Sequence, residues 1–167
     1  MSELEAVYEM EDGTRLEIRP LKASDEKAWL DFVNGLSPDS LYHRLFQVRK
    51  PFSHGDTGHF LEISPEKRTA VVAVTRGKIV AVARYELAPG SKIGEFAIVV
   101  GDNYQNKGLG SFLLGILADH AKSKGIEELV AEMFPDNERM LELCRKSGYR
   151  MDSKVESDTR IIKLHLQ

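Results

Sequence analysis

The sequence predicts an α+β fold with a mixed, mostly antiparallel central sheet flanked by helices. Two neighbouring runs rich in Val and Ile, Thr69–Thr75 and Lys78–Leu87, are joined by the dipeptide Arg76-Gly77, which predicts a β-hairpin. A third apolar run, Ile93–Val100, enters a glycine-rich turn. Beyond that turn apolar residues recur at helical spacing, so a strand and a helix flank the glycines.

The composition fits one globular domain. The chain has 167 residues, 42% of them hydrophobic, which suffices for a sizeable core. The net charge of −3 argues against nucleic acid as a partner. No run is long enough to span a membrane, so no membrane partner is expected. The single cysteine, Cys144, excludes an internal disulfide and favours a reducing compartment, so we expect a cytoplasmic location.

The first elements are a strand and a helix. Residues 1–13 are acidic and lack the apolar core of a signal peptide, so we expect a loose lead-in, with residues 14–167 forming the single domain. Thr14–Arg19 alternates apolar and polar residues up to Pro20, which predicts a strand. Ser24 can cap the following helix. Its predicted buried face contains Ala28, Trp29, Phe32, Val33 and Leu36. Two further short helices are expected, one from Ser37 to Phe46 and one between Ser53 and Pro65.

The helices and strands after the glycine turn are predicted from residues that cap helices and from glycines that end them. The helix after Gly108 carries a continuous apolar face and stops at Gly125. Ile126–Met133 is then predicted as a strand, and Asp136 begins a helix that Gly148 ends. The last predicted element is a hairpin, with strands at Tyr149–Val155 and Thr159–Leu166.

The glycine turn itself predicts an anion-binding site. Its residues are Gln105, Asn106, Lys107, Gly108, Leu109 and Gly110. Backbone N–H groups at the start of a helix favour a phosphate or pyrophosphate. The turn is not a P-loop, because no Gly-Lys-Ser/Thr ends it, and Leu113 stands where a dinucleotide fingerprint requires its third glycine. A plain strand-to-helix turn is the alternative interpretation.

Two signatures together resemble the GNAT superfamily of N-acetyltransferases. The family loop Gln/Arg-x-x-Gly-x-Gly/Ala matches the segment from Gln105 to Gly110. The second family signature, an Asn that opens a helix ending in Gly-Phe/Tyr, matches Asn137 and Gly148-Tyr149. The order and distance of the two matches also fit. The resemblance implies the GNAT fold and acetyl-CoA, or another acyl-CoA, as co-substrate, with no metal.

The resemblance also implies where the acyl donor lies. Pantetheine would fit between the strand ending at Val100 and the strand Ile126–Met133, which would splay apart, and would pair with backbone groups as an added strand does. The pyrophosphate would rest on the loop amides, and Arg145 would lie near the CoA end. The implied donor-binding residues are Ile98, Val99, Val100, Gln105, Asn106, Lys107, Gly108, Leu109, Gly110, Ser111 and Asn137.

The chemistry requires a base, and Glu95 is the candidate. A lysine amine with a pKa of ~10.4 must lose a proton before it attacks, which costs roughly 4–5 kcal/mol at pH 7. A nearby carboxylate can accept that proton. Glu95 begins the apolar strand of the donor site, and we expect partial desolvation there. A backbone N–H near Ile98 or Val99 would polarise the thioester carbonyl. The general acid stays open among Cys144, Tyr149 and water.

The acceptor is the least determined partner. The strings Glu95-Phe96-Ala97-Ile98 and SPDSLYHRLF (Ser37 to Phe46) are similar to the bacterial protein lysine acetyltransferases of the Pat type. This similarity favours a primary amine on a protein lysine as acceptor. A small-molecule amine acetyltransferase and a non-catalytic acyl-CoA-binding regulatory module are the alternatives. Either a monomer or a homodimer is compatible with the family.

Overall fold

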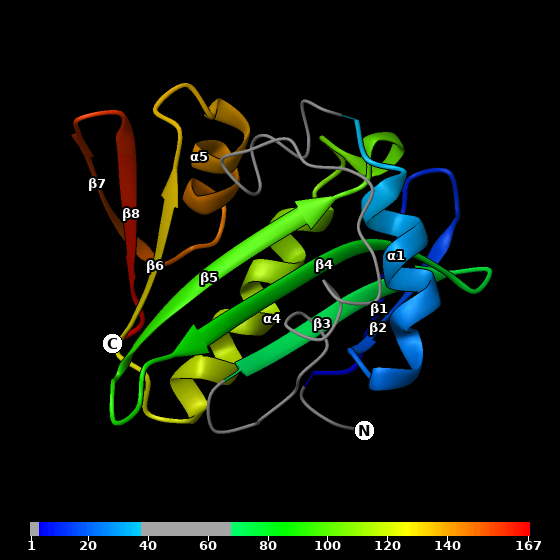
Figure 1. The fold of residues 1–167 in the computed structure, drawn as a ribbon, viewed down its shortest axis with the longest axis horizontal. Coiled ribbons are helices and arrows are strands. Elements are labelled where there is room, and N and C mark those ends of the chain that lie inside the picture. The colour runs from blue at the N-terminus through cyan, green and yellow to red at the C-terminus, as the bar shows by residue number, and fades with distance from the viewer. Residues whose placement is uncertain (1–3, 38–67) are drawn as a thin grey trace.

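The computed structural model describes residues 4–37 and 68–167, which form a mixed sheet with helices on both faces (Figure 1). The helices expected at Ser37–Phe46 and between Ser53 and Pro65 lie outside the described residues, apart from Ser37 itself. The strands are β1 (Ala6–Glu9), β2 (Arg15–Pro20), β3 (Arg68–Thr75), β4 (Lys78–Leu87), β5 (Ile93–Val100), β6 (Glu128–Met133), β7 (Arg150–Glu156) and β8 (Thr159–His165). The described helices are α1 (Glu26–Asn34), α4 (Leu109–Ser123) and α5 (Glu138–Arg145), with short 3₁₀ turns at Ala23–Asp25 and Asp102–Tyr104.

The sheet follows the strand order β1-β2-β3-β4-β5-β6-β8-β7 in the described part of the chain. Every neighbouring pair is antiparallel except β5 and β6, which run parallel. The predicted α+β class, with a mixed and mostly antiparallel sheet, is therefore confirmed. The two predicted hairpins are also present, as β3–β4 and β7–β8.

The N-terminal segment contains a strand, so the expected loose lead-in is wrong for Ala6–Glu9. This strand, β1, pairs antiparallel with β2 and places Tyr8 opposite Leu16. Along β1 half-buried and exposed residues alternate, with Ala6 and Tyr8 packed against the main core. The strand is short, and the exposed apolar residue Val7 obscures the alternation. The backbone hydrogen bonds to β2 stabilise this strand, which local propensity does not predict.

Each face of the sheet buries its own hydrophobic cluster. On one face α1 packs through Trp29, Phe32 and Val33, in agreement with the predicted helix face, and Leu36 joins the same cluster from just beyond the end of the helix. On the other face α4 contributes residues without measurable exposure, namely Leu113, Leu114, Leu117, Ala118 and Ala121. In Figure 1, α1 lies in front of the sheet and α4 behind it. This sandwich of helix, sheet and helix holds the central strands rigidly.

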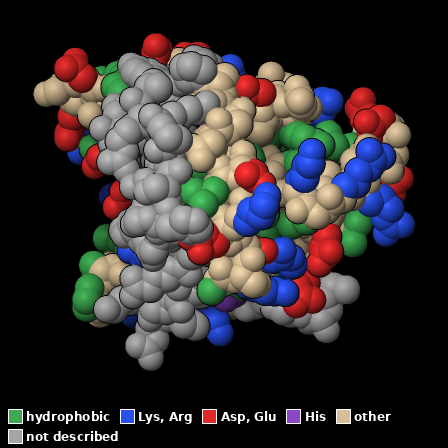
Figure 2. All heavy atoms as spheres, turned by 45° about the vertical axis from the view of Figure 1, so that its right-hand side comes forward, with side chains coloured by type: hydrophobic (Ala, Val, Ile, Leu, Met, Phe, Trp, Pro, Cys, Tyr) green, Lys and Arg blue, Asp and Glu red, His purple; other side chains and the backbone are tan. Residues whose placement is uncertain are grey.

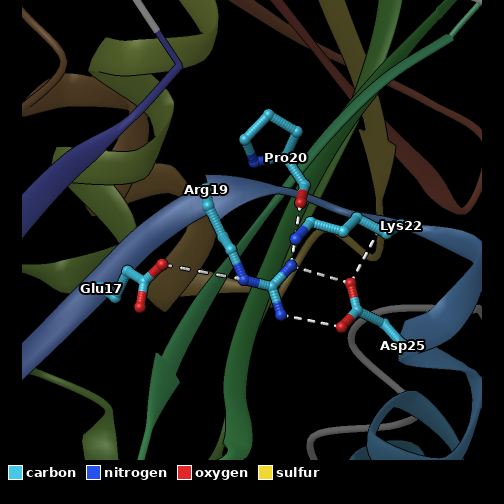
Figure 3. Close-up of polar contacts among 5 residues, drawn as sticks. All are labelled: Glu17, Arg19, Pro20, Lys22 and Asp25. Atoms are coloured by element: carbon cyan, nitrogen blue, oxygen red, sulfur yellow. Dashed lines mark hydrogen bonds and ion pairs between the residues drawn. The ribbon is translucent and has the colours of Figure 1, made fainter. Parts of the chain in front are cut away.

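An ion pair joins the end of β2 to the start of α1 (Figure 3). Two guanidinium nitrogens of Arg19 donate to the two carboxylate oxygens of Asp25, at 2.8 and 2.9 Å. Asp25 also accepts from the backbone N–H of Lys22 at 2.8 Å. Asp25, rather than the predicted Ser24, occupies the N-cap position of α1. Both partners are largely buried, with side chains 19% and 9% exposed, so the pair is a structural connection rather than a surface contact.

Replacing Asp25 tests the contribution of this connection. The hydrogen bonds from Arg19 lower the pKa of Asp25, although partial burial acts in the opposite direction. The pair therefore stabilises the fold above the unfolded carboxyl pKa of about 3.9, and this contribution is lost as the pH falls through the lower folded pKa. We expect Asp25→Asn to cost about 1.5–3 kcal/mol at pH 7. Below pH 4 the variant should differ less from wild type, as urea unfolding at both pH values will show.

The matched control is Asp31→Asn. Asp31 pairs with Lys27 at 2.9 Å on the outer face of α1, where the two side chains are 69% and 90% exposed. An exposed pair of this kind contributes less than about 1 kcal/mol. Equal destabilisation by both substitutions at pH 7 would contradict the role assigned to Asp25.

Candidate acyl-donor site

The site begins where β5 and β6 separate. The two strands pair in parallel only over Ile93–Glu95 and Glu128–Val130, whereas β5 continues to Val100. Beyond Glu95 no described strand pairs with this edge of β5. The predicted divergence of the two strands is therefore confirmed. It leaves the backbone of Ile98–Val100 accessible to a ligand that pairs as a strand does.

The glycine loop continues directly from this open edge. Gly101 donates its N–H to the carbonyl of Val80 at 2.8 Å, and Gln105 Nε2 donates to the Val100 carbonyl at 2.8 Å. The first contact ties the loop to β4, and the second ties it to the end of β5. Asn106 and Gly108 then adopt left-handed backbone conformations, with φ of 62° and 83°. Gly108 is the N-cap residue of α4, so the following N–H groups lie at the positive end of the helix dipole.

A cavity of about 240 Å³ occupies the space bounded by β5, the loop and α5. Most of the residues predicted to bind the donor line it. These are Ile98, Val99, Val100, Gln105, Asn106, Gly108, Gly110, Ser111 and Asn137. Asn137 is buried, and its Oδ1 accepts from the Met140 N–H at 3.1 Å, which caps α5. The site residues from three separate segments of the chain thus meet around one space.

Three predicted residues lie outside the cavity lining: Glu95, Lys107 and Leu109. Leu109 is 1% exposed and packs in the core, while the Lys107 side chain is exposed and its carbonyl accepts a hydrogen bond from Tyr8. Glu95 is exposed, so the expected partial desolvation is not found. The alternation of β5 explains this, because Phe96 and Ile98 enter the α4 core whereas Glu95 projects from the opposite face.

Charged residues surround Glu95 on that face of the sheet. Its cross-strand neighbour on β4 is Glu86, which pairs with Arg68 at 2.6 Å. Burial lowers the pKa of Arg84, and the charges of Glu86 and Glu95 partly oppose that shift. Glu95 therefore lies among charged side chains of both signs on this face of the sheet.

The cavity-facing side of α5 is the part of the site that the sequence prediction missed. Its residues are Arg139, Met140, Glu142, Leu143 and Lys146, and Tyr104 joins them from the loop. Arg139 donates to Gln105 Oε1 and so connects α5 to the loop. The opposite face of α5 buries Leu141 and Cys144, so helical periodicity contained the signal. Arg145, which was expected near the CoA end, lies outside this lining and pairs with Glu142 at 3.4 Å.

The two side chains considered as general acid also lie outside the lining. Cys144 has no exposure, and burial raises the pKa of its thiol to about 12. The Tyr149 hydroxyl donates to Asp119, and burial together with this contact raises its pKa to about 12. Neither group lines the cavity.

Surface charge, the grouping of metal-ligating side chains and the apolar length of the helices are the remaining features of the described residues. On the face presented in Figure 2, acidic and basic side chains of the described residues are interspersed, which gives no field of one sign over that face. Among residues 4–37 and 68–167, no group of three or more His, Cys, Asp or Glu side chains could hold a metal ion. Within the same residues, no helix has both the length and the apolar character needed to cross a bilayer.

Comparison with known proteins agrees with this geometry. Residues 8–149 match the Acetyltransferase (GNAT) family. The chain is 27% identical over 160 residues to Acetyltransferase PA5475 of Pseudomonas aeruginosa, covering 93% of this chain and 86% of the relative. It is 29% identical over 140 residues to Acetyltransferase Pat of Mycolicibacterium smegmatis. That match covers 78% of this chain but only 40% of Pat, so the chain spans less than half of that relative's length.

A solved structure extends the comparison to three dimensions. The GNAT domain of S. lividans PAT superposes with a TM-score of 0.88 at 26% identity, covering 99% of this chain and 98% of the domain. Agreement over this length means that the two chains share one fold. The chain therefore belongs to the Acetyltransferase (GNAT) family, near its Pat-type members, and is an acyl-CoA-dependent N-acetyltransferase.

Proposed function

We propose that the protein transfers an acetyl group from acetyl-CoA to a protein lysine side chain, with Glu95 as general base. One observation supports the mechanism. Glu95 is the last β5 residue paired with β6, and the open edge of Ile98–Val100, which lines the cavity, comes next along β5. A thioester held along that edge has a carboxylate at one end and the loop amides at the other. The similarity to Pat and to S. lividans PAT supports a protein lysine as acceptor.

Donor binding would use main-chain groups of three segments. The free edge of Ile98–Val100 pairs with the pantetheine amides. The N–H groups from Asn106 to Ser111 receive the pyrophosphate at the start of α4. Because the Oδ1 of Asn137 accepts from Met140, its Nδ2 group is the one that can donate to pantetheine. The cavity-facing cation Arg139 adds positive charge beside the same loop.

Acetyl transfer then requires one proton acceptor and one stabilised oxygen. The amine nitrogen bonds to the thioester carbon, the carbon–sulfur bond breaks, and the amine proton passes to Glu95 directly or through a water. A backbone N–H of Ile98 or Val99 stabilises the carbonyl oxygen as it gains charge. The departing thiolate takes its proton from solvent or from the attacking amine, because Cys144 and Tyr149 lie outside the cavity.

An acceptor screen tests the substrate class. The protein is incubated with acetyl-CoA and either lysine-containing proteins and peptides or small amines such as polyamines, amino acids and aminoglycosides, and mass spectrometry locates the added acetyl group. We expect acetyl-lysine in polypeptides. Turnover confined to small amines would overturn the proposed acceptor and leave the donor chemistry intact.

Glu95→Gln tests the base. We expect kcat to fall by about 10²–10⁴, because the amide cannot accept the proton, while the Kd for CoA measured by calorimetry stays unchanged. Glu132→Gln is the matched control, since Glu132 is an exposed carboxylate on the neighbouring strand β6. The control should retain full turnover. Wild-type kcat in Glu95→Gln would remove the proposed role.

Gly108→Ala tests the loop. The positive φ of Gly108 strains any residue with a Cβ, and a Cβ there would lie 2.8 Å from the Tyr8 hydroxyl oxygen. Strain of about 1–3 kcal/mol should weaken CoA binding by about 5- to 150-fold in calorimetry. Gly115→Ala is the control, because a Cβ added at this position within α4 would meet no described atom within 4 Å. That substitution should leave the Kd unchanged, so equal losses in both variants would argue against a role specific to the loop.

A further inference from the structure

The N-terminal strand reaches the glycine loop through one side chain. The Tyr8 hydroxyl donates to the carbonyl oxygen of Lys107 at 2.6 Å, although the two residues lie 99 positions apart. The Tyr8 ring also packs against Phe112 on α4, with centroids 4.9 Å apart and planes inclined by 44°. The hydroxyl therefore contacts Lys107, which directly precedes the N-cap Gly108, and the ring contacts Phe112 in the first turn of α4.

The contacted carbonyl determines where a neighbouring N–H points. The Lys107 carbonyl and the Gly108 N–H belong to one planar trans peptide group and point in opposite directions. Because Tyr8 binds the carbonyl from outside the cavity, the Gly108 N–H is directed to the other side of the loop. Gly108 lines the cavity, whereas Lys107 and Tyr8 do not.

This peptide group is one that could rotate without such a contact. Asn106 and Gly108 on either side of Lys107 both have positive φ, and glycine adopts several backbone conformations at similar energy. A rotated peptide would direct the Lys107 carbonyl, an acceptor, toward the place where the phosphate oxygens are expected. The loop therefore needs a contact that favours one orientation.

We propose that Tyr8 is a positioning residue of the acyl-donor site: its hydroxyl holds the Lys107–Gly108 peptide with the N–H directed at the pyrophosphate. The inference rests on the proposed placement of the pyrophosphate on the loop amides. It makes β1 a part of the donor site, since this strand carries Tyr8 and pairs it opposite Leu16 of β2. Tyr8 acts through the loop and does not itself contact the substrate.

Tyr8→Phe removes the hydroxyl and keeps the ring on Phe112. Calorimetry with CoA should show a Kd raised about three- to tenfold, the equivalent of one lost hydrogen bond. The affinity for pantetheine, which lacks the pyrophosphate, should stay unchanged. With a lysine peptide as acceptor, the KM for acetyl-CoA should rise while kcat at saturating acetyl-CoA is retained.

Tyr85→Phe is the matched control. Tyr85 is a buried tyrosine whose hydroxyl contacts His120 Nδ1 at 2.8 Å in the core and lies outside the cavity lining. It should lower the melting temperature without changing the Kd for CoA. A selective loss of CoA affinity in Tyr8→Phe alone supports the proposal.

The outcomes separate this inference from the proposed function. An unchanged Kd for CoA in Tyr8→Phe, or an equal loss of affinity for CoA and pantetheine, overturns the positioning role while leaving the enzyme intact. A wild-type protein that binds CoA no more tightly than pantetheine overturns the pyrophosphate placement itself, and the inference with it.

Discussion

The early end of the parallel pairing between β5 and β6 is the constraint on which the site depends. After Glu95 the two strands separate, and the backbone groups of Ile98–Val100 lose a strand partner on that side. Exposed strand edges attract a further strand, and an extended ligand with amide groups meets the same need. The cavity, the access of the loop amides and the position of Glu95 all follow from this divergence.

The hydrophobic core keeps the separation between β5 and β6 from closing. The central strands β3, β4 and β5 pack against α1 on one face and against α4 on the other. Leu16, Val71, Ala73 and Leu129 are fully buried in the cluster on the α4 face. A sheet packed on both faces at close to crystalline density does not readily close a gap by bending. The loop at the start of α4 is held by the same packing, because Leu109 and Leu113 anchor the first turns of that helix in the core.

The site combines local geometry with distant contacts. The loop is bonded internally, through Gln105 to the Val100 carbonyl, and externally, through Arg139 from α5 and Tyr8 from β1. Such contacts from opposite sides reduce the conformational freedom that binding would otherwise remove. In the proposed donor site, loop amides that are already held in place would lose less conformational entropy on binding an anion than a mobile loop would.

The sequence by itself determined the strand, glycine turn and helix at residues 93–123, the two hairpins and a helix close after Asp136, because these depend on periodicity and capping within a few residues. The N-cap of that helix is Asn137, as the GNAT resemblance implied, and not the Asp136 that capping preference predicted. Only the tertiary structure decided that Ala6–Glu9 is a strand, that Glu95 faces away from the α4 core, and that α5 lines the cavity with Arg139 and Leu143. These features arise from pairing and packing between distant segments. The alternation of β5 and the periodicity of α5 define two faces for each element, whereas the surfaces buried after folding decide what each face meets.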